Sequence, residues 1–167
     1  MQSNQAAFIK LMKHPVKNRM FLFTRLPAAF FAGVRLRDVS EHSCQVSVPY
    51  KWLSQNPFRS TYFACLSMAA EMSTGALAMS NVYRSSPPVS MLVVKVESEY
   101  FKKATTRTYF VCDDGALFTR AVEEAIATGE PRTVRAKSVG RNKEGDLIAE
   151  FYFTWSFRAK RETTDKS

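Results

Sequence analysis

Cysteine and histidine are scarce in this sequence. The three cysteines, Cys44, Cys65 and Cys112, are scattered, and the two histidines, His14 and His42, lie in its first third. Neither residue type occurs with the spacing of a metal site, so the sequence predicts no bound metal. A sparse, odd set of cysteines is typical of reduced thiols, which favours a cytoplasmic protein.

The sequence also lacks a secretory signal and a run apolar enough to span a membrane. The N-terminus is amphipathic, but it has no long apolar core and no cleavage site. The longest apolar segment, residues 61–80, carries several Ser and Thr residues and a glutamate. These polar groups make the segment too costly for a lone membrane span.

Phenylalanine and positive charge are abundant instead. The chain of 167 residues contains 13 Phe and is 46% hydrophobic, which predicts one folded domain with a sizeable core. The net charge of +9 favours an anionic partner, either a nucleic acid, a membrane surface or a ligand that carries phosphate.

The spacing of apolar residues predicts an α+β protein without internal repeats. The expected order is helices over 4–13 and 16–24, a hairpin over 34–48, a helix over 61–80, strands over 89–100 and 105–112, a helix over 115–128, and strands over 132–141 and 147–157. Ser60 and Thr61 are expected to cap the long helix. Because this helix is apolar nearly all round, it should be buried, and an antiparallel sheet curling around it would bury it.

One charged side chain, Glu71, interrupts the apolar stretch between Arg59 and Arg84. A lone buried carboxylate costs several kcal/mol, so it must be paired, hydrogen-bonded or solvated in a cleft. Its helix face carries small residues: Ala64, Ser67, Thr74, Gly75 and Ala78. Two interpretations stay open. Glu71 is a general base or nucleophile, or it is structural, capped by Ser67 or Thr74 or paired with an Arg of a second subunit.

The start of the long helix is a second candidate. The free N–H groups of Phe63 or Ala64, with the helix dipole behind them, would stabilise a developing oxyanion. Asn56 would orient water or a carbonyl group, or would form a turn before Pro57. Tyr62 would offer a hydroxyl group, or would simply pack.

Both candidates fit a known family pattern. The order of elements over residues 33–158 resembles the hotdog superfamily, whose best-known members are acyl-CoA thioesterases. In the branch related to phenylacetyl-CoA thioesterases, an Asn precedes the central helix, a His-Gly-Gly turn follows, and an acidic residue lies in the third helical turn. Asn56 and Glu71 match this pattern, whereas Tyr62, Phe63 and Ala64 take the place of His-Gly-Gly. The segment EYFKKA (99–104) is similar to the aromatic-x-basic-x-Ala step of many members.

The resemblance implies a hotdog domain over residues 32–159, in which an antiparallel sheet wraps around the long central helix. An N-terminal helical segment (1–31) would precede it, one helix would be inserted among its strands, and a polar tail (160–167) would follow. The implied reaction is hydrolysis of acyl-CoA to acid and free CoA, with CoA as part of the substrate and no other cofactor. The implied assembly is a homodimer or a dimer of dimers.

The resemblance also distributes roles. Glu71, Asn56, Phe63 and Ala64 would be catalytic, with Glu71 contributed by the partner of the subunit that supplies the helix start. The implied substrate-binding residues are Tyr62, Arg59, Ser67 and Thr74.

Two other functions remain open. The first is a non-catalytic protein that binds acyl groups or acyl-CoA. The second is a basic nucleic-acid-associated module, which is disfavoured because the aromatics alternate inward and no stacking platform is evident. The basic residues are dispersed and would hold CoA phosphates or form an ordinary surface. A dehydratase of the same fold is disfavoured because the long helix contains no His.

Overall fold

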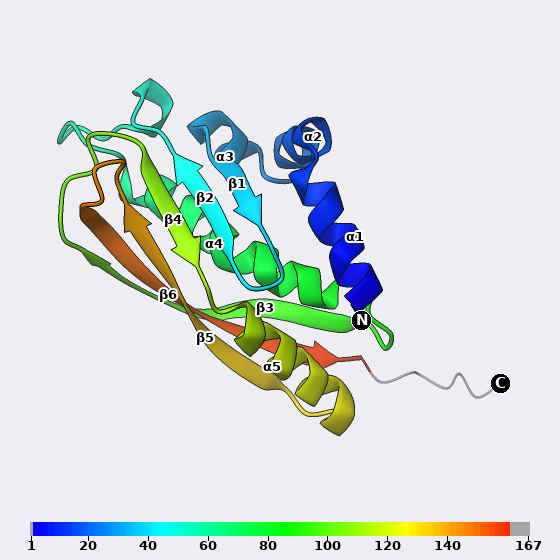
Figure 1. Cartoon of the computed structure of the whole chain (residues 1–167). Helices are drawn as coiled ribbons and strands as arrows, with labels where there is room; N and C mark the ends of the chain where they lie inside the picture. Colours follow the sequence, from blue (N-terminus) through cyan, green and yellow to red (C-terminus); the bar gives the residue numbers. More distant parts are fainter. Residues whose placement is uncertain (1, 161–167) are drawn as a thin grey trace.

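The computed structural model describes residues 2–160, which form helices on and around one antiparallel sheet (Figure 1). The helices are α1 (Gln2–Lys13), α2 (Pro15–Arg25), α3 (Pro27–Ala32), the 3₁₀ helix η1 (Trp52–Ser54), α4 (Phe63–Val82) and α5 (Gly115–Thr128). The strands are β1 (Arg35–Val39), β2 (Cys44–Val48), β3 (Val89–Tyr100), β4 (Thr108–Cys112), β5 (Arg132–Arg141) and β6 (Leu147–Ala159). Among these residues, no helix combines the length and the hydropathy needed to cross a bilayer.

The sheet has the order β1-β2-β4-β5-β6-β3, and every neighbouring pair is antiparallel. It curves around α4, as Figure 1 shows, and this confirms the predicted hotdog architecture. Strand β6 alternates as its sequence predicts, with Phe151, Phe153, Trp155 and Phe157 buried against the core. Each fully buried side chain of this size contributes about 1.5–3 kcal/mol.

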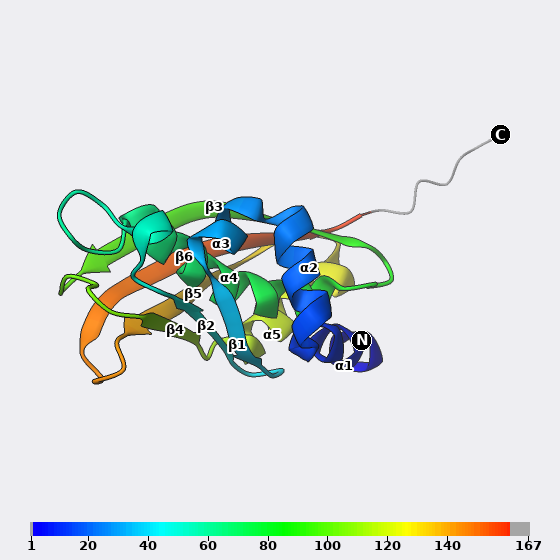
Figure 2. The same cartoon turned by 90° about the horizontal axis from the view of Figure 1, so that it is seen from above.

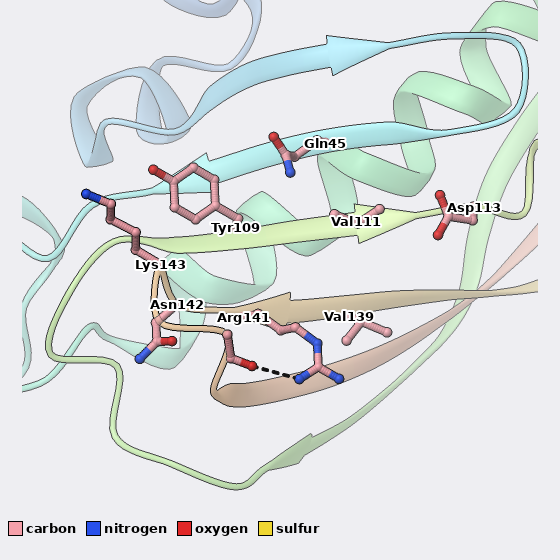
Figure 3. Close-up of a pocket in the computed structure, with 9 residues that line it drawn as sticks. Gln45, Tyr109, Val111, Asp113, Val139, Arg141, Asn142 and Lys143 are labelled. Atoms are coloured by element: carbon pink, nitrogen blue, oxygen red, sulfur yellow. Dashed lines mark hydrogen bonds between the residues drawn. The ribbon is translucent and has the colours of Figure 1, made fainter.

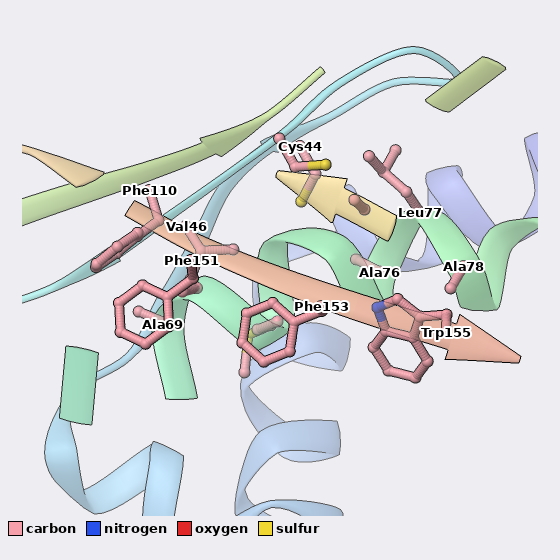
Figure 4. Packing of buried hydrophobic residues seen from close by; sticks show 14 of the residues in the cluster. Cys44, Val46, Ala69, Ala76, Leu77, Ala78, Phe110, Phe151, Phe153 and Trp155 are labelled. Carbon is pink, nitrogen blue, oxygen red and sulfur yellow. The ribbon is translucent and has the colours of Figure 1, made fainter. Parts of the chain in front are cut away.

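Helix α4 is buried on most of its circumference, which explains its apolar composition. Figure 4 shows small residues of α4, including Ala69, Ala76 and Ala78, close to the aromatic rings of β4 and β6. A buried pair of hydroxyl groups, Ser73 and Ser138, joins α4 to β5 at 2.7 Å. Small side chains on the helix therefore leave room for the large rings that the sheet contributes.

Helices α1 and α3 pack on the part of α4 that the sheet leaves open, and α2 packs against α1 and α3 (Figures 1 and 2). The amide of Gln5 on α1 donates to Ser80 and Asn81 at 3.4 Å. The ring of Phe8 packs against that of Tyr83, with centroids 5.3 Å apart. These contacts tie α1 to the C-terminal end of α4.

Several local predictions were wrong. The expected caps of the long helix do not cap it, because the Ser60 hydroxyl donates to Asn56 and the Thr61 hydroxyl donates to the carbonyl of Ala104. The cap residue is Tyr62, which makes no side-chain capping bond. Helix α3 was not predicted as a separate element. Strand β4 was predicted over 105–112 but begins at Thr108, where its pairing with β2 begins at Val48. Residues 161–167 of the predicted tail lie outside the described residues.

Candidate active site

A cavity of about 500 Å³ lies between the N-terminal helices, α4 and the sheet. We call it the Glu71 cavity. It is mostly apolar, and its lining comes from α1, α2, α4, β3 and β6: Phe8, Met12, Phe21, Arg25, Leu26, Glu71, Met72, Gly75, Ala76, Met79, Met91, Leu92, Val93 and Trp155. A space of this size and composition suits an apolar ligand.

The carboxylate of Glu71 is half-buried in this cavity. It makes no hydrogen bond or ion pair with any residue from 2 to 160, although Arg25 lines the same cavity. Because burial penalises the charged form, the pKa of the Glu71 carboxyl group is raised above its ordinary value. An unpaired carboxylate with a raised pKa in an apolar cavity has the properties of a proton acceptor.

The neighbours of Glu71 fix its position without neutralising it. Gly75 lies one turn further along α4, and a Cβ atom there would approach Glu71 Oε1 to 2.8 Å and the Trp155 ring to 3.4 Å. The glycine therefore provides the space that the carboxylate occupies. Thr74 is buried, donates to the main-chain carbonyl of Glu71 at 2.9 Å, and accepts a hydrogen bond from Trp155 Nε1 at 3.0 Å. Thr74 thus orients the cavity wall and does not line it.

A second hollow, of about 560 Å³, surrounds the start of α4. We call it the helix-start hollow. The N–H groups of Phe63 and Ala64 donate to no acceptor in the described part of the chain, as expected for the first turn of a helix. Tyr62 and Phe63 are exposed and pack edge to face, with ring centroids 4.9 Å apart. Lys102 and Lys103 lie on the rim of the same hollow.

Asn56 shapes the loop that leads into α4. Its side-chain oxygen accepts hydrogen bonds from the N–H groups of Phe58 and Ser60 at 3.0 and 3.2 Å, and from the Ser60 hydroxyl at 3.2 Å. This is the turn-forming arrangement among the two interpretations of Asn56. Arg59 is exposed in the same turn with a positive φ of 57°.

The two hollows are separate within one chain. Glu71 and Phe63 are eight positions apart on α4, which corresponds to about 12 Å along the helix axis. The Glu71 cavity reaches the beginning of β3 at Met91, whereas the helix-start hollow reaches its end at Tyr100. Of the other predicted residues, Asn56 and Tyr62 line the helix-start hollow, and Ala64, Arg59, Ser67 and Thr74 line neither.

A third hollow, of about 610 Å³, lies on the outer face of the sheet, opposite α4 (Figure 3). Figure 3 shows Gln45, Tyr109 and Val111 beside one another, with Arg141 donating to the Gly145 carbonyl at 2.9 Å. This hollow contains none of the predicted catalytic residues. Within residues 2–160, no cluster of His, Cys, Asp or Glu is arranged to hold a metal ion.

The walls of the Glu71 cavity were not predicted from the sequence. Trp155 lies 81 positions from its hydrogen-bond partner, and no local pattern connects the two. The cavity lining from α1 and α2 was also missed, although the apolar spacing of Phe8 and Met12 signals a packed face. Thr74 and Gly75 were placed correctly beside Glu71, because separations of three and four residues bring neighbours together on a helix.

One protein family matches most of this chain. The family described as "Domain of unknown function (DUF4442)" matches residues 17–156. No curated protein sequence matches the chain.

Several solved structures share the fold. PA5026 from Pseudomonas aeruginosa, described as "Probable Thioesterase", has a TM-score of 0.74 at 17% identity, over 90% of this chain and 99% of that one. Thioesterase HI1161 from Haemophilus influenzae has a TM-score of 0.61 at 11% identity, over 87% and 92%. A mutant of thioesterase PA1618 from Pseudomonas aeruginosa has a TM-score of 0.63 at 12% identity, over 89% and 96%.

Proposed function

Because the chain belongs to the DUF4442 family and has the hotdog fold of thioesterase-like proteins, we propose that it hydrolyses acyl-CoA thioesters to a carboxylic acid and free CoA. The observation that carries this proposal is the unpaired Glu71 carboxylate in an apolar cavity. The reaction needs only water as the second substrate, so the proposal includes no further cofactor.

Glu71 acts in this proposal as the general base. Its raised pKa strengthens it as a proton acceptor relative to an exposed glutamate. It removes a proton from a water molecule as the water attacks the thioester carbonyl. When the C–S bond of the tetrahedral intermediate breaks, the leaving CoA thiolate takes up this proton, and Glu71 returns to its ionised form. The acyl chain lies along the apolar lining, where several methionines, such as Met72 and Met91, adapt to its shape.

The oxyanion of the tetrahedral intermediate binds the free amides at the start of α4. A base that activates water and the donors that hold the oxyanion must lie within a few ångströms of the same carbonyl. Glu71 and Phe63 of one chain are about 12 Å apart along the helix, so a single chain cannot supply both. The proposed site therefore combines Glu71 of one subunit with the helix start of a second.

Strand β3 offers the geometry for such a dimer. It is an edge strand of the sheet, and it exposes Leu92, Val94 and Val96. An unpaired edge of this kind is a template for a further strand. Antiparallel pairing of two β3 strands places the beginning of one beside the end of the other. The Glu71 cavity of each subunit then meets the helix-start hollow of its partner.

The same arrangement provides a place for the CoA phosphates. Lys102 and Lys103 follow β3 on the rim of the helix-start hollow. Lys102 is ion-paired with Asp146, so Lys103 is the candidate of the two to bind a phosphate. Lysine ammonium groups bind phosphate oxygens through charge-assisted hydrogen bonds. Asn56 holds the loop that positions the amides, and in this role it acts on catalysis through them.

The test is the Glu71→Gln variant, assayed by the release of free thiol from medium-chain acyl-CoA. Glutamine keeps the shape of the side chain but cannot accept the proton, so the rate should fall by about 10²–10⁴-fold. Glu123→Gln is the matched control, because Glu123 is exposed on α5, and it should hydrolyse like the parent. Equal rates for Glu71→Gln and the parent would rule out a catalytic Glu71.

One observation favours non-catalytic binding as the second candidate. Bulky exposed residues, Tyr62 and Phe63, occupy the helix start, where the family pattern described above has a His followed by a Gly. A binder would show calorimetric affinity for acyl-CoA in the parent and in Glu71→Gln alike, with no thiol released by either protein.

A further inference from the structure

The N-terminal helices turn an apolar stripe outward. On α2, Val16, Met20 and Phe23 are spaced as i, i+4 and i+7, which aligns them on one helix face. Their exposed fractions are 67%, 60% and 54%. The opposite face, with Asn18 and Leu22, is buried. The helix therefore exposes large apolar side chains where an ordinary surface helix would expose polar ones.

The stripe continues onto the neighbouring elements. The ring of Phe23 packs against that of Phe31 on α3, with centroids 6.3 Å apart, and Phe31 is 53% exposed. Helix α3 contacts η1, where Trp52 and Leu53 are 80% and 51% exposed. Figures 1 and 2 both show α2, α3 and η1 gathered at the same side of the molecule. We call this surface the α2–α3–η1 face.

Positive charge surrounds this face. Residues 1–34 contain five Lys or Arg and no Asp or Glu, which is more than half of the net charge of +9. On α2, Lys17 and Arg19 flank the apolar stripe, and the Arg19 guanidinium stacks over the ring of Phe30 at 4.1 Å. Lys51 adjoins η1, beside Gly33 at the end of α3. Within residues 2–160, only Lys13 of the N-terminal cations has an ion-pair partner, Asp38.

We propose that the α2–α3–η1 face docks on an anionic lipid bilayer surface. Aromatic and aliphatic side chains insert at the headgroup level, and the flanking Lys and Arg side chains bind lipid phosphates. Trp52 suits this boundary because its ring is apolar while its indole N–H can bond to water or to a headgroup. The Phe rings add apolar area for insertion. Docking brings the Glu71 cavity next to the bilayer, since Phe21 and Leu26 of the same helices line it.

The positive charge of the α2–α3–η1 face favours an anionic bilayer over a second copy of the chain as its occupant. A two-fold self-contact brings the same patch of both subunits together. The elements of the face, residues 15–33 and 51–54, contain four cations and no carboxylate: Lys17, Arg19, Arg25 and Lys51. A self-contact would set these four cations against four more. An anionic lipid surface neutralises them instead, and this complementarity decides between the two occupants.

The experiment is flotation of the full chain with vesicles of phosphatidylglycerol and phosphatidylcholine in equal parts, compared with phosphatidylcholine alone. The parent should float with the anionic vesicles at low salt and be released at high salt. Lys17→Glu should lower the partition coefficient by about 30-fold, because each charge unit near the surface contributes about fivefold. Arg120→Glu, an exposed charge reversal on α5, should bind like the parent.

The apolar part of the face has its own pair of variants. Met20→Asp should lower the partition coefficient at least about tenfold, because it adds a negative charge and removes an inserting side chain. Leu117→Asp makes a similar change at an exposed position of α5 and should leave binding unchanged. Thermal melts check that all four variants are folded.

Two results would overturn the proposal. One is equal binding of the parent to both kinds of vesicle at the same low salt. The other is a change in sedimentation mass on Met20→Asp in a protein that does not float, which would identify the face as a self-contact.

Discussion

Glu71 combines two properties that are hard to hold in one residue, burial and freedom from a partner. Thr74 bonds the main-chain carbonyl of Glu71, but among residues 2–160 no cation pairs with its carboxylate, so the cost of burying the charge is not offset. Because burial raises the pKa of its carboxyl group, Glu71 binds a proton more tightly in the folded chain than in the unfolded one. Function and stability are therefore opposed at this single side chain.

This conflict between function and stability predicts that the difference in melting temperature between the parent and Glu71→Gln depends on pH. A raised folded-state pKa gives the parent stability that is complete below the unfolded value of about 4.3 and is lost as the pH rises through the folded value. Glutamine does not titrate. The variant should therefore gain in melting temperature over the parent as the pH rises from about 4.3. A difference that stays constant with pH, or a variant that melts lower throughout, would identify Glu71 as a structural residue.

Gly75→Ala should move the Glu71 carboxylate without destabilising the helix, so it tests whether activity depends on the carboxylate position. The new methyl group would lie 2.8 Å from Glu71 Oε1, and the flexible end of that side chain can move away. Alanine in place of glycine within a helix contributes up to about 1 kcal/mol. We expect an unchanged or higher melting temperature with reduced thiol release. A variant with parental activity would show that the carboxylate position is not critical.

At the scale of elements, contacts between turns and helices fix the layers. Helix α5 begins against the β1–β2 turn, where the Gly115 N–H donates to the His42 carbonyl at 3.0 Å. A Cβ atom at Gly115 would approach the Glu41 carbonyl oxygen to 2.2 Å. Here the obstacle is main chain, which cannot rotate away as the Glu71 side chain can.

Gly115→Ala should therefore destabilise the protein by about 1–3 kcal/mol, the usual range for overpacking. Each kcal/mol lowers the melting temperature by about 2–4 °C in a domain of this size. Gly75→Ala is the internal comparison, because the same substitution meets a movable neighbour there. Melting temperatures that are equal in the two variants would contradict this distinction between a rigid and a movable obstacle.

In the whole molecule, the longer of the two edge strands of the sheet, β3, has a free outer edge. Among the strands of residues 2–160, β3 pairs with β6 alone, and its exposed apolar side chains adjoin both hollows. Pairing with a second β3 would satisfy the free main-chain groups and would complete the proposed site. Assembly and activity are therefore expected to be lost together.

Val94→Asp tests this coupling by placing a charge at an exposed position of β3. We expect the parent to sediment as a dimer or larger at micromolar concentration, and the variant as a monomer that has lost thiol release. Leu117→Asp on α5 should keep both properties. A monomeric parent with full activity would disprove the shared site.

The sequence by itself determined the order of the strands and of the longer helices, the burial of α4 and the position of its single charge, but not α3 or η1. These features follow from periodicity and composition, which act between residues a few positions apart. The alternation of β6 and the helical register of Glu71 and Gly75 are of this kind, and the structure has both.

Only the tertiary structure decided what surrounds Glu71. The cavity walls come from α1, α2, β3 and β6, and the Trp155–Thr74 hydrogen bond joins residues 81 positions apart. It also decided that the Asn56 side-chain oxygen accepts hydrogen bonds within its own loop. The Ser60 and Thr61 hydroxyl groups donate to Asn56 and to the Ala104 carbonyl, and not to the start of the helix. Polar side chains near a helix start have several partners within reach, and packing of the whole chain selects among them.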